Sequence, residues 1–202
     1  MAESLPEDPS SATKTRAGAR ALELTGKRVR LKPLEEADAP ALFDAVESSR
    51  EALKRWLVWV PEVGAQGDEA AFIRRSGTES ARGEASVWGL FEVRAGPLAG
   101  IVSLDALAPA ERARGRLCVW VRADRRSRGY ATEGGRLLVD HAFRKLGLHR
   151  VFSRIDPTNR AGRRVLRKLG FRYEGRLRDD WKINGRWIDH ECWGLLKTDW
   201  KR

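Results

Sequence analysis

A basic loop before a predicted helix carries the clearest chemistry in this sequence. The run from Arg126 to Ala131 reads RSRGYA, so arginines alternate with small residues just where the helix should begin. The first amide groups of a helix have no partner inside the helix, and the helix dipole favours an anion at that end. Glycine and alanine let a ligand approach the main chain closely. The loop is therefore predicted to bind a diphosphate group through its amides.

Two common nucleotide-binding patterns do not fit this loop. It lacks the Gly-Lys-Ser/Thr ending of a nucleoside-triphosphate loop and the glycine spacing of a dinucleotide-binding turn. An ordinary basic surface turn remains the alternative for these six residues taken alone. The choice between the two depends on what surrounds the loop in the chain.

The charge distribution favours an anionic ligand in the same part of the chain. The formal net charge is +11. The first 20 residues are neutral, with three basic and three acidic side chains, whereas residues 122–178 hold 17 Lys and Arg against 5 Asp and Glu, an excess of 12. Such a concentration indicates that something anionic docks there. For any single arginine, a solvated helix face is the alternative.

The loop lies within an alternation of predicted strands and helices. Hydrophobic periodicity and turn residues predict strands at 29–34, 87–93, 98–104, 116–121, 150–155, 172–178 and 186–195. They predict helices at 35–47, 67–80, 132–145 and 159–169, besides an aromatic helix-to-loop segment at 50–61. These elements predict an α/β domain, mixed in the α+β sense, with a central sheet of six to seven strands flanked by helices.

Length and composition predict a single domain. A chain of 202 residues with 42% apolar content can bury one core. Residues 1–20 lack periodicity and are expected to be a disordered tail, and residues 21–202 are expected to form the domain. The sequence has neither a signal peptide nor a membrane-length apolar run, so we expect a cytoplasmic protein without a membrane partner. Cys118 and Cys192 lie in apolar strands, which favours buried thiols over a disulfide or a metal site.

The order of motifs resembles the GNAT superfamily of N-acetyltransferases. After the basic loop come a strand, the turn Asp156–Asn159, a short basic helix and the run Lys168–Phe171. The resemblance covers nearly all of residues 22–202, and it is most specific to the branch of ribosomal-protein N-terminal acetyltransferases of the RimJ/RimL type. The marks of that branch are the tryptophan-rich segment Leu53–Val60, the run Gly129–Glu133, the closing Asn184–Trp187, and Asp189 with His190.

The resemblance implies a single GNAT domain that uses acetyl-CoA. In such a fold strand four, at 116–121, splays from strand five, at 150–155, and the pantetheine arm of coenzyme A pairs with the exposed backbone. The basic loop would hold the pyrophosphate, and Asn159 would bind pantetheine or order a water. The residues implied as coenzyme-binding are Val119, Trp120, Val121, Arg126, Ser127, Arg128, Gly129, Tyr130, Ala131, Thr132, Asn159 and Arg163, with Arg164 as a further phosphate contact.

The family also implies direct attack of a neutral amine on the thioester in a ternary complex, with main-chain donors of strand four on the thioester oxygen. This sequence departs from the family at its proton-transfer positions. Gly162 and Leu166 stand where members often carry a serine or tyrosine acid, and Arg116 stands where strand four often carries a glutamate. Asp105 and Asp180 are the candidate catalytic bases, because both are expected at strand ends facing the acceptor.

The acceptor implied by the resemblance is a protein or peptide N-terminal amine, as on a ribosomal protein. Trp56, Trp59 and Trp181 are expected to line its pocket, with core packing as the alternative. A small-amine acceptor such as an antibiotic or polyamine, or a succinyl-CoA donor, stays open. A ribosome- or RNA-binding module that has lost catalysis is the alternative of another class, although the enzyme reading requires no nucleic acid. The sequence leaves the oligomeric state open, a homodimer included.

Overall fold

Eight strands form one mixed sheet in the computed structural model, which describes residues 23–94, 96–107 and 112–201. The predicted tail at 1–20 lies outside the described residues. The strands are β1 (Leu24–Thr25), β2 (Val29–Pro33), β3 (Ser86–Glu92), β4 (Leu98–Asp105), β5 (Arg114–Val121), β6 (Arg150–Ile155), β7 (Arg172–Ile183) and β8 (Arg186–Leu196). The helices are α1 (Ala39–Glu47), α2 (Arg50–Leu53), α3 (Gln66–Ala81), α4 (Tyr130–Arg144) and α5 (Arg160–Leu169), with short 3-10 turns at Glu36–Asp38, Val60–Glu62, Ala123–Arg125 and Lys197–Asp199.

The sheet order confirms the predicted mixed topology. The strands run β1-β2-β3-β4-β5-β6-β8-β7, and among these neighbours only β5 and β6 are parallel. The sheet has eight strands where six to seven were predicted. The additional strand is β1, whose two residues are too short to leave an alternating pattern in the sequence.

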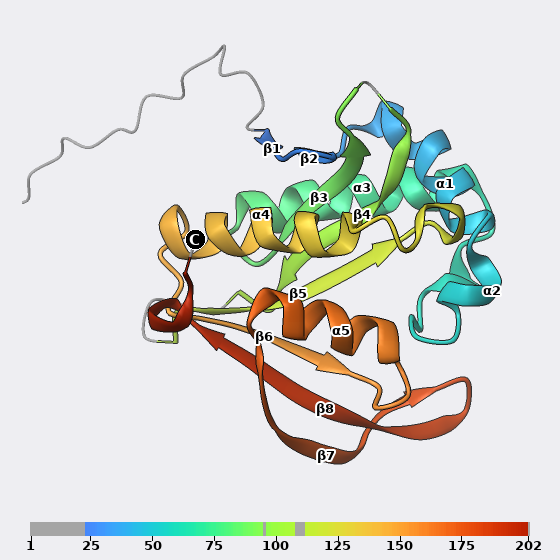
Figure 1. Ribbon diagram of the computed structural model, residues 1–202. Coiled ribbons are helices and arrows are strands. Elements are labelled where there is room, and N and C mark those ends of the chain that lie inside the picture. The colour runs from blue at the N-terminus through green and yellow to red at the C-terminus, as the bar shows by residue number, and fades with distance from the viewer. Residues whose placement is uncertain (1–22, 95, 108–111, 202) are drawn as a thin grey trace, which may run out of the picture.

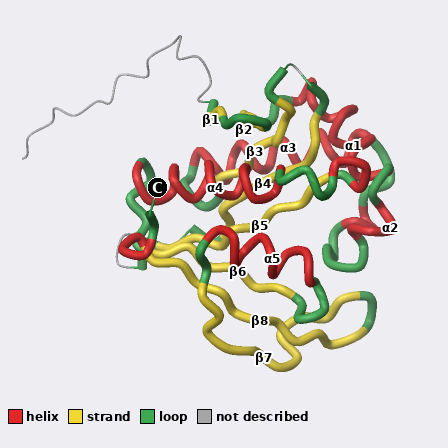
Figure 2. Tube along the Cα trace, in the orientation of Figure 1, coloured by secondary structure: helices red, strands yellow, loops and turns green. Residues whose placement is uncertain are grey.

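Helices cover both faces of the sheet (Figures 1 and 2). On one face, α4 and α5 pack their apolar sides onto β2 to β6 and β8, and Leu117, Leu138 and Trp193 are buried in that core. On the other face, α1 and α3 cover only the N-terminal half of the sheet, where Phe91, Leu98 and Ile101 are buried. We call these the α4 face and the α1 face.

Glycine and asparagine set several element boundaries. Gly129 and Gly170 both adopt the left-handed conformation, at the start of α4 and the end of α5, as glycine readily does. Asn184 and Gly185 have φ values of 49° and 79°, the positive pair that a two-residue hairpin turn requires. Helix α4 begins at Tyr130, two residues before its predicted start, because Gly129 already ends the loop.

Each helix in the described ranges is too short or too polar to span a bilayer. Both cysteines are free and half-buried, so they form no disulfide with each other.

A buried carboxyl group on α3 lacks a partner among the residues that the structure describes. The side chain of Glu69 is almost entirely buried, and its Oε1 accepts no hydrogen bond from any described residue. Burial, helped by the neighbouring Asp68 carboxylate, raises the pKa of Glu69 to about 7. An unpartnered buried carboxylate is costly, so this side chain weakens the fold once it ionises.

We therefore predict that Glu69→Gln stabilises the protein more at high pH than at low pH. The pKa of Glu69 is raised in the folded state, so the unfolded chain loses this proton first and stability falls as pH rises from about 4 to about 7. The glutamine amide does not ionise, so the variant avoids this fall in the free energy of unfolding, which is on the order of 1 to 3 kcal/mol. Urea unfolding near pH 5 and near pH 8 measures the difference. The control Glu79→Gln, on the same helix, should show no such growth, and an equal effect of Glu69→Gln at both pH values would contradict the prediction.

Candidate active site

The basic loop presents a continuous row of unpaired amides. From Arg126 to Thr132, no main-chain N–H donates a hydrogen bond to an acceptor in the described ranges, and the first helical bond of α4 runs from the Glu133 amide to the Gly129 carbonyl at 3.0 Å. Ser127 and Gly129 have φ values of 62° and 83°, which break the regular turn. Free amides at a helix start are a ready anion site.

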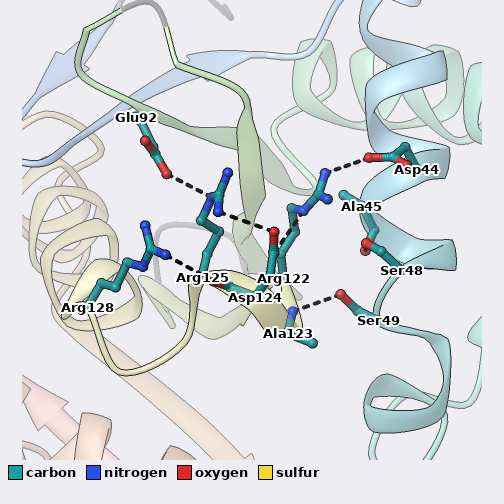
Figure 3. Close-up of polar contacts among 10 residues, drawn as sticks. All are labelled: Asp44, Ala45, Ser48, Ser49, Glu92, Arg122, Ala123, Asp124, Arg125 and Arg128. Atoms are coloured by element: carbon teal, nitrogen blue, oxygen red, sulfur yellow. Dashed lines mark hydrogen bonds and ion pairs between the residues drawn. The ribbon is translucent and has the colours of Figure 1, made fainter.

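Side-chain contacts hold the start of this loop against α1, α2 and β3 (Figure 3). Arg122 and Arg125 supply the charged contacts, and Ser49 supplies a neutral one. The contacts are Arg122 Nη1 to Asp44 Oδ2 at 2.6 Å, Arg125 Nε to Glu92 Oε1 at 3.0 Å, the Ala123 amide to Ser49 Oγ at 2.9 Å, and Arg128 Nη2 to the Asp124 carbonyl at 3.3 Å. The loop is thus held by side chains, and its amides are left for a ligand.

Strands β5 and β6 separate beyond Arg116. Their parallel pairing ends at Arg116 opposite Phe152, although β5 continues to Val121 and β6 to Ile155. Figure 1 shows the two strands diverging toward their C-terminal ends. This separation confirms the predicted splay of strands four and five, and we call it the fork.

The fork leaves main-chain groups of β5 unpaired. The carbonyl of Leu117 points toward β6, because it accepts a hydrogen bond from Ser153 Oγ at 3.0 Å. The Arg122 amide points the other way, to Ala99 of β4 at 2.8 Å. Since backbone direction alternates along a strand, the N–H and C=O of Val119 and the N–H of Val121 point into the fork. They have no partner among the described residues, so an extended ligand could pair with them.

Helix α5, which packs on the α4 face of the sheet, carries a cavity lined by arginines. The cavity has a volume of about 300 Å³, and its lining residues are Arg160, Arg163, Arg164 and Arg167. The Arg163 guanidinium is already engaged, with Nε 3.0 Å from Glu191 Oε2 and Nη1 donating to the Pro157 carbonyl at 3.1 Å. Arg160 and Arg164 are exposed and make no ion pair with a described residue.

The start of α5 explains two of the departures from the family pattern. Asn159 caps the helix, its Oδ1 accepting from the Gly162 amide at 2.9 Å. A Cβ at Gly162 would lie 2.2 Å from Ile155 Cδ1, so the isoleucine fills the space that a serine would need. Leu166 is buried in the core. Neither Gly162 nor Leu166 therefore carries a side-chain group that can donate a proton.

On the α1 face, Asp105 is tied to two neighbours. Its Oδ2 lies 3.3 Å from Arg116 Nη2 and 3.2 Å from Cys118 Sγ. Burial, with Asp105 adding to it, raises the pKa of Cys118 to about 12. The thiol therefore stays protonated near neutral pH, which agrees with chemistry that uses no cysteine nucleophile.

A second cluster on the α1 face brings two predicted site residues, Asp180 and Trp181, against His190, for which no role was predicted. The buried His190 has Nδ1 3.1 Å from Asp180 Oδ2, and Asp180 Oδ1 also lies 3.2 Å from Arg154 Nη1. The Trp181 ring packs edge-on against His190 with centroids 5.3 Å apart, and the Arg116 guanidinium lies 5.1 Å from the Trp181 centroid. The two clusters are therefore joined through Trp181.

The predicted pocket tryptophans do not form one group. Trp59 lies beside Trp120 of β5, with ring centroids 6.3 Å apart. Trp181 belongs to the His190 cluster instead. Trp56 is half-buried under the Arg55 guanidinium, 4.7 Å from its ring centroid, and contacts neither of the others through a ring.

A larger cavity than the one on α5 lies elsewhere. It measures about 710 Å³ and lies between β1 and the later turns of α4, with Arg136, Asp140 and Trp200 in its wall. The unpaired amides lie at the opposite end of α4. We therefore place the candidate active site at the fork and the basic loop.

Three comparisons with known proteins agree with this geometry. The protein named "Probable N-acetyltransferase YjcK" of Bacillus subtilis (strain 168) is 29% identical over 177 residues, which cover 87% of this chain and 98% of that protein. The spermidine N(1)-acetyltransferase of Escherichia coli (strain K12) is 30% identical over 92 residues, 46% of this chain and 49% of that one. RimL, a ribosomal L7/L12 alpha-N-protein acetyltransferase solved in complex with coenzyme A, superimposes with a TM-score of 0.82 at 20% identity, covering 87% of this chain and 98% of RimL.

The chain also matches a family over most of its length. Residues 28–172 match the family described as acetyltransferase (GNAT) domain. That range includes the basic loop, the fork and the whole of α5. The chain is therefore an N-acetyltransferase of the GNAT domain family.

Proposed function

We propose that this enzyme transfers an acetyl group from acetyl-CoA to the N-terminal amine of a protein or peptide. The observation that carries the proposal is the run of unpartnered amides from Arg126 to Thr132 beside the unpaired backbone of β5. The amides suit a diphosphate, and Val119 to Val121 suit an extended amide-bearing arm. RimL, which shares the fold, was solved with coenzyme A.

The remaining residues predicted to bind coenzyme A have narrower roles. Arg126 makes no ion pair with a described residue and is available for a phosphate, whereas Arg163 would first have to leave Glu191. Arg160 and Arg164 are better placed to supply charge from α5. The Asn159 amide nitrogen stays available to a ligand, because its oxygen caps the helix.

An N-terminal amine fits a site in which Gly162, Leu166 and Arg116 occupy the family's usual acid and base positions. An α-amino group has a pKa of roughly 7.7 to 8.0, so on the order of a tenth is neutral near pH 7, whereas a lysine amine at about 10.4 is neutral only to a few parts in ten thousand. The predicted bases Asp105 and Asp180 are each already engaged in an ion pair with an arginine. The acceptor is therefore one that already carries a usable lone pair.

The similarity to a spermidine acetyltransferase keeps a polyamine acceptor as a second candidate. A polycation needs negative charge around its amines. On the α1 face both predicted bases are neutralised by Arg116 and Arg154. The described part of this face therefore favours a singly charged acceptor.

The coenzyme site predicts a specific loss on substitution of Gly129. A valine there would have to adopt a φ near 83°, which a β-branched residue strongly disfavours, and would distort the row of amides. We expect acetyl-CoA affinity to fall by about tenfold or more for Gly129→Val, as 1.4 kcal/mol of lost binding implies. Isothermal titration calorimetry measures it.

Gly147→Val is the matched control. Gly147 has a similar φ of 68°, follows the other end of α4 and has open space around it. It should cost stability and leave acetyl-CoA affinity unchanged. Equal losses of affinity in the two variants would contradict the proposed site, as would the absence of acetyl-CoA binding by the unsubstituted protein. Binding to RNA that weakens steeply with salt, without acetyl-CoA binding, would support the RNA-binding alternative instead.

The acceptor is tested with matched amines. We expect peptides with a free N-terminus to be acetylated faster than their N-terminally blocked, lysine-containing counterparts or spermidine, by at least about tenfold near pH 7, because far more of the α-amine is neutral. Mass spectrometry of the products gives both rate and position. Faster acetylation of spermidine would favour the polyamine acceptor, and turnover of succinyl-CoA in place of acetyl-CoA would change the donor.

A further inference from the structure

The His190 cluster has the arrangement of a proton-accepting pair. Nδ1 of His190 is sealed from solvent and lies 3.1 Å from Asp180 Oδ2, an ion-pair contact whose geometry is not that of a regular hydrogen bond. A carboxylate at that distance favours the tautomer with its proton on Nδ1, because a lone pair on Nδ1 would be repelled by the negative oxygen. Nε2 then carries the lone pair. It has no hydrogen-bond partner among the described residues, and it is not sealed from solvent as Nδ1 is.

The backbone of β7 and β8 builds this pair. Alternation along β8 sends Trp193 into the core of the α4 face, and it therefore sends His190 to the α1 face. The register of β7 shifts between Leu177 and Trp181, with Asp179 at a φ of 47°. A bulge of this kind redirects side chains, and here Asp180 meets His190.

The pair lies at the mouth of the fork. Glu191, next to His190, is paired with Ile155, the last residue of β6, where β6 has already parted from β5. Trp181 links His190 to Arg116, the last β5 residue that pairs with β6. His190 is thus on the α1 face, opposite the face that carries α4, α5 and the basic loop.

We propose that His190 is the catalytic base for the acceptor amine and that Asp180 is its positioning residue. The proposal rests on the proposed function. The neutral amine nitrogen forms a bond to the acyl carbon, the carbon–sulfur bond breaks, and its electron pair leaves on sulfur. The proton lost by the nitrogen passes to Nε2, and the imidazolium, held by Asp180, returns that proton to the thiolate. The products are the amide and the free thiol.

The charged groups around His190 suit this role. Burial lowers the pKa of His190, while the Asp180 and Asp156 carboxylates oppose that shift and Arg154 adds to it. The imidazole is therefore neutral near pH 7 and can accept a proton. Arg154 Nη1 donates to both oxygens of Asp180, at 3.2 and 3.3 Å, and so fixes the carboxylate that orients the ring.

The first test replaces the ring. His190→Gln should lower kcat/KM for an N-terminal peptide by about 100-fold, the usual contribution of a positioned base, with acetyl-CoA affinity by calorimetry unchanged. His149→Gln, at an exposed position, is the matched control and should keep full activity. His190→Asn is a second variant should the first fold poorly. Wild-type rates in either folded His190 variant would overturn the proposal.

The second test combines a readout that needs no turnover with a pH–rate profile. The protein has three histidines, so the His190 ring can be followed by NMR during a pH titration. Asp180→Asn should lower the pKa of His190 and shift the acid limb of the kcat/KM profile to lower pH by the same amount, at a reduced plateau. The titration of the amine is common to both proteins and does not move. An unchanged His190 pKa in Asp180→Asn would overturn the pairing.

The two proposals fail in different ways. A wild-type protein that acetylates none of the amines tested would defeat the proposed function, and the assignment of His190 with it. Active wild-type protein with equally active His190 variants would defeat the assignment of His190 alone.

Discussion

The parting of β5 from β6 is the constraint around which the candidate site is built. Ser153 Oγ donates a hydrogen bond to the Leu117 carbonyl at the point where the strands separate, so this carbonyl is not left unpaired. Beyond it, Val119 and Val121 keep polar groups that a sheet would normally satisfy. The basic loop follows directly from the free end of β5, and His190 lies near the free end of β6. The end of the pairing between β5 and β6 therefore determines where a bound ligand can approach His190.

The arginines divide into structural and available groups. Arg122 and Arg125 hold the loop by pairing with Asp44 and Glu92, and Arg163 pairs with Glu191. Much of the positive charge that the sequence places in this region is therefore neutralised by ion pairs within the molecule. The anion-binding capacity comes instead from main-chain amides, which carry no formal charge and are invisible in a count of lysines and arginines.

Local signals in the sequence were enough for the loop, and the family resemblance implied the splayed strands, but neither identified the His190 cluster. Gly129 and Asn159 have strong local preferences, so the boundaries that they set were predicted to within two residues. His190 entered only as part of the family pattern, because its contact with Asp180 depends on a bulge in the neighbouring strand, and no periodicity shows which residue of β7 faces it. The engagement of Arg163 by Glu191 was missed for the same reason, since their contact joins residues far apart in the chain.

Strand β7 affects whether copies of the molecule can associate through the edges of their sheets. It lies at the end of the sheet order, so one side of its backbone has no strand beside it within the described residues. An unpaired strand edge of this kind can form hydrogen bonds with a strand of another molecule and extend the sheet. Two register shifts and the exposed charges of Arg176, Arg178 and Lys182 make it an uneven and repulsive template. The same irregularity that turns Asp180 toward His190 therefore also discourages assembly into extended sheets.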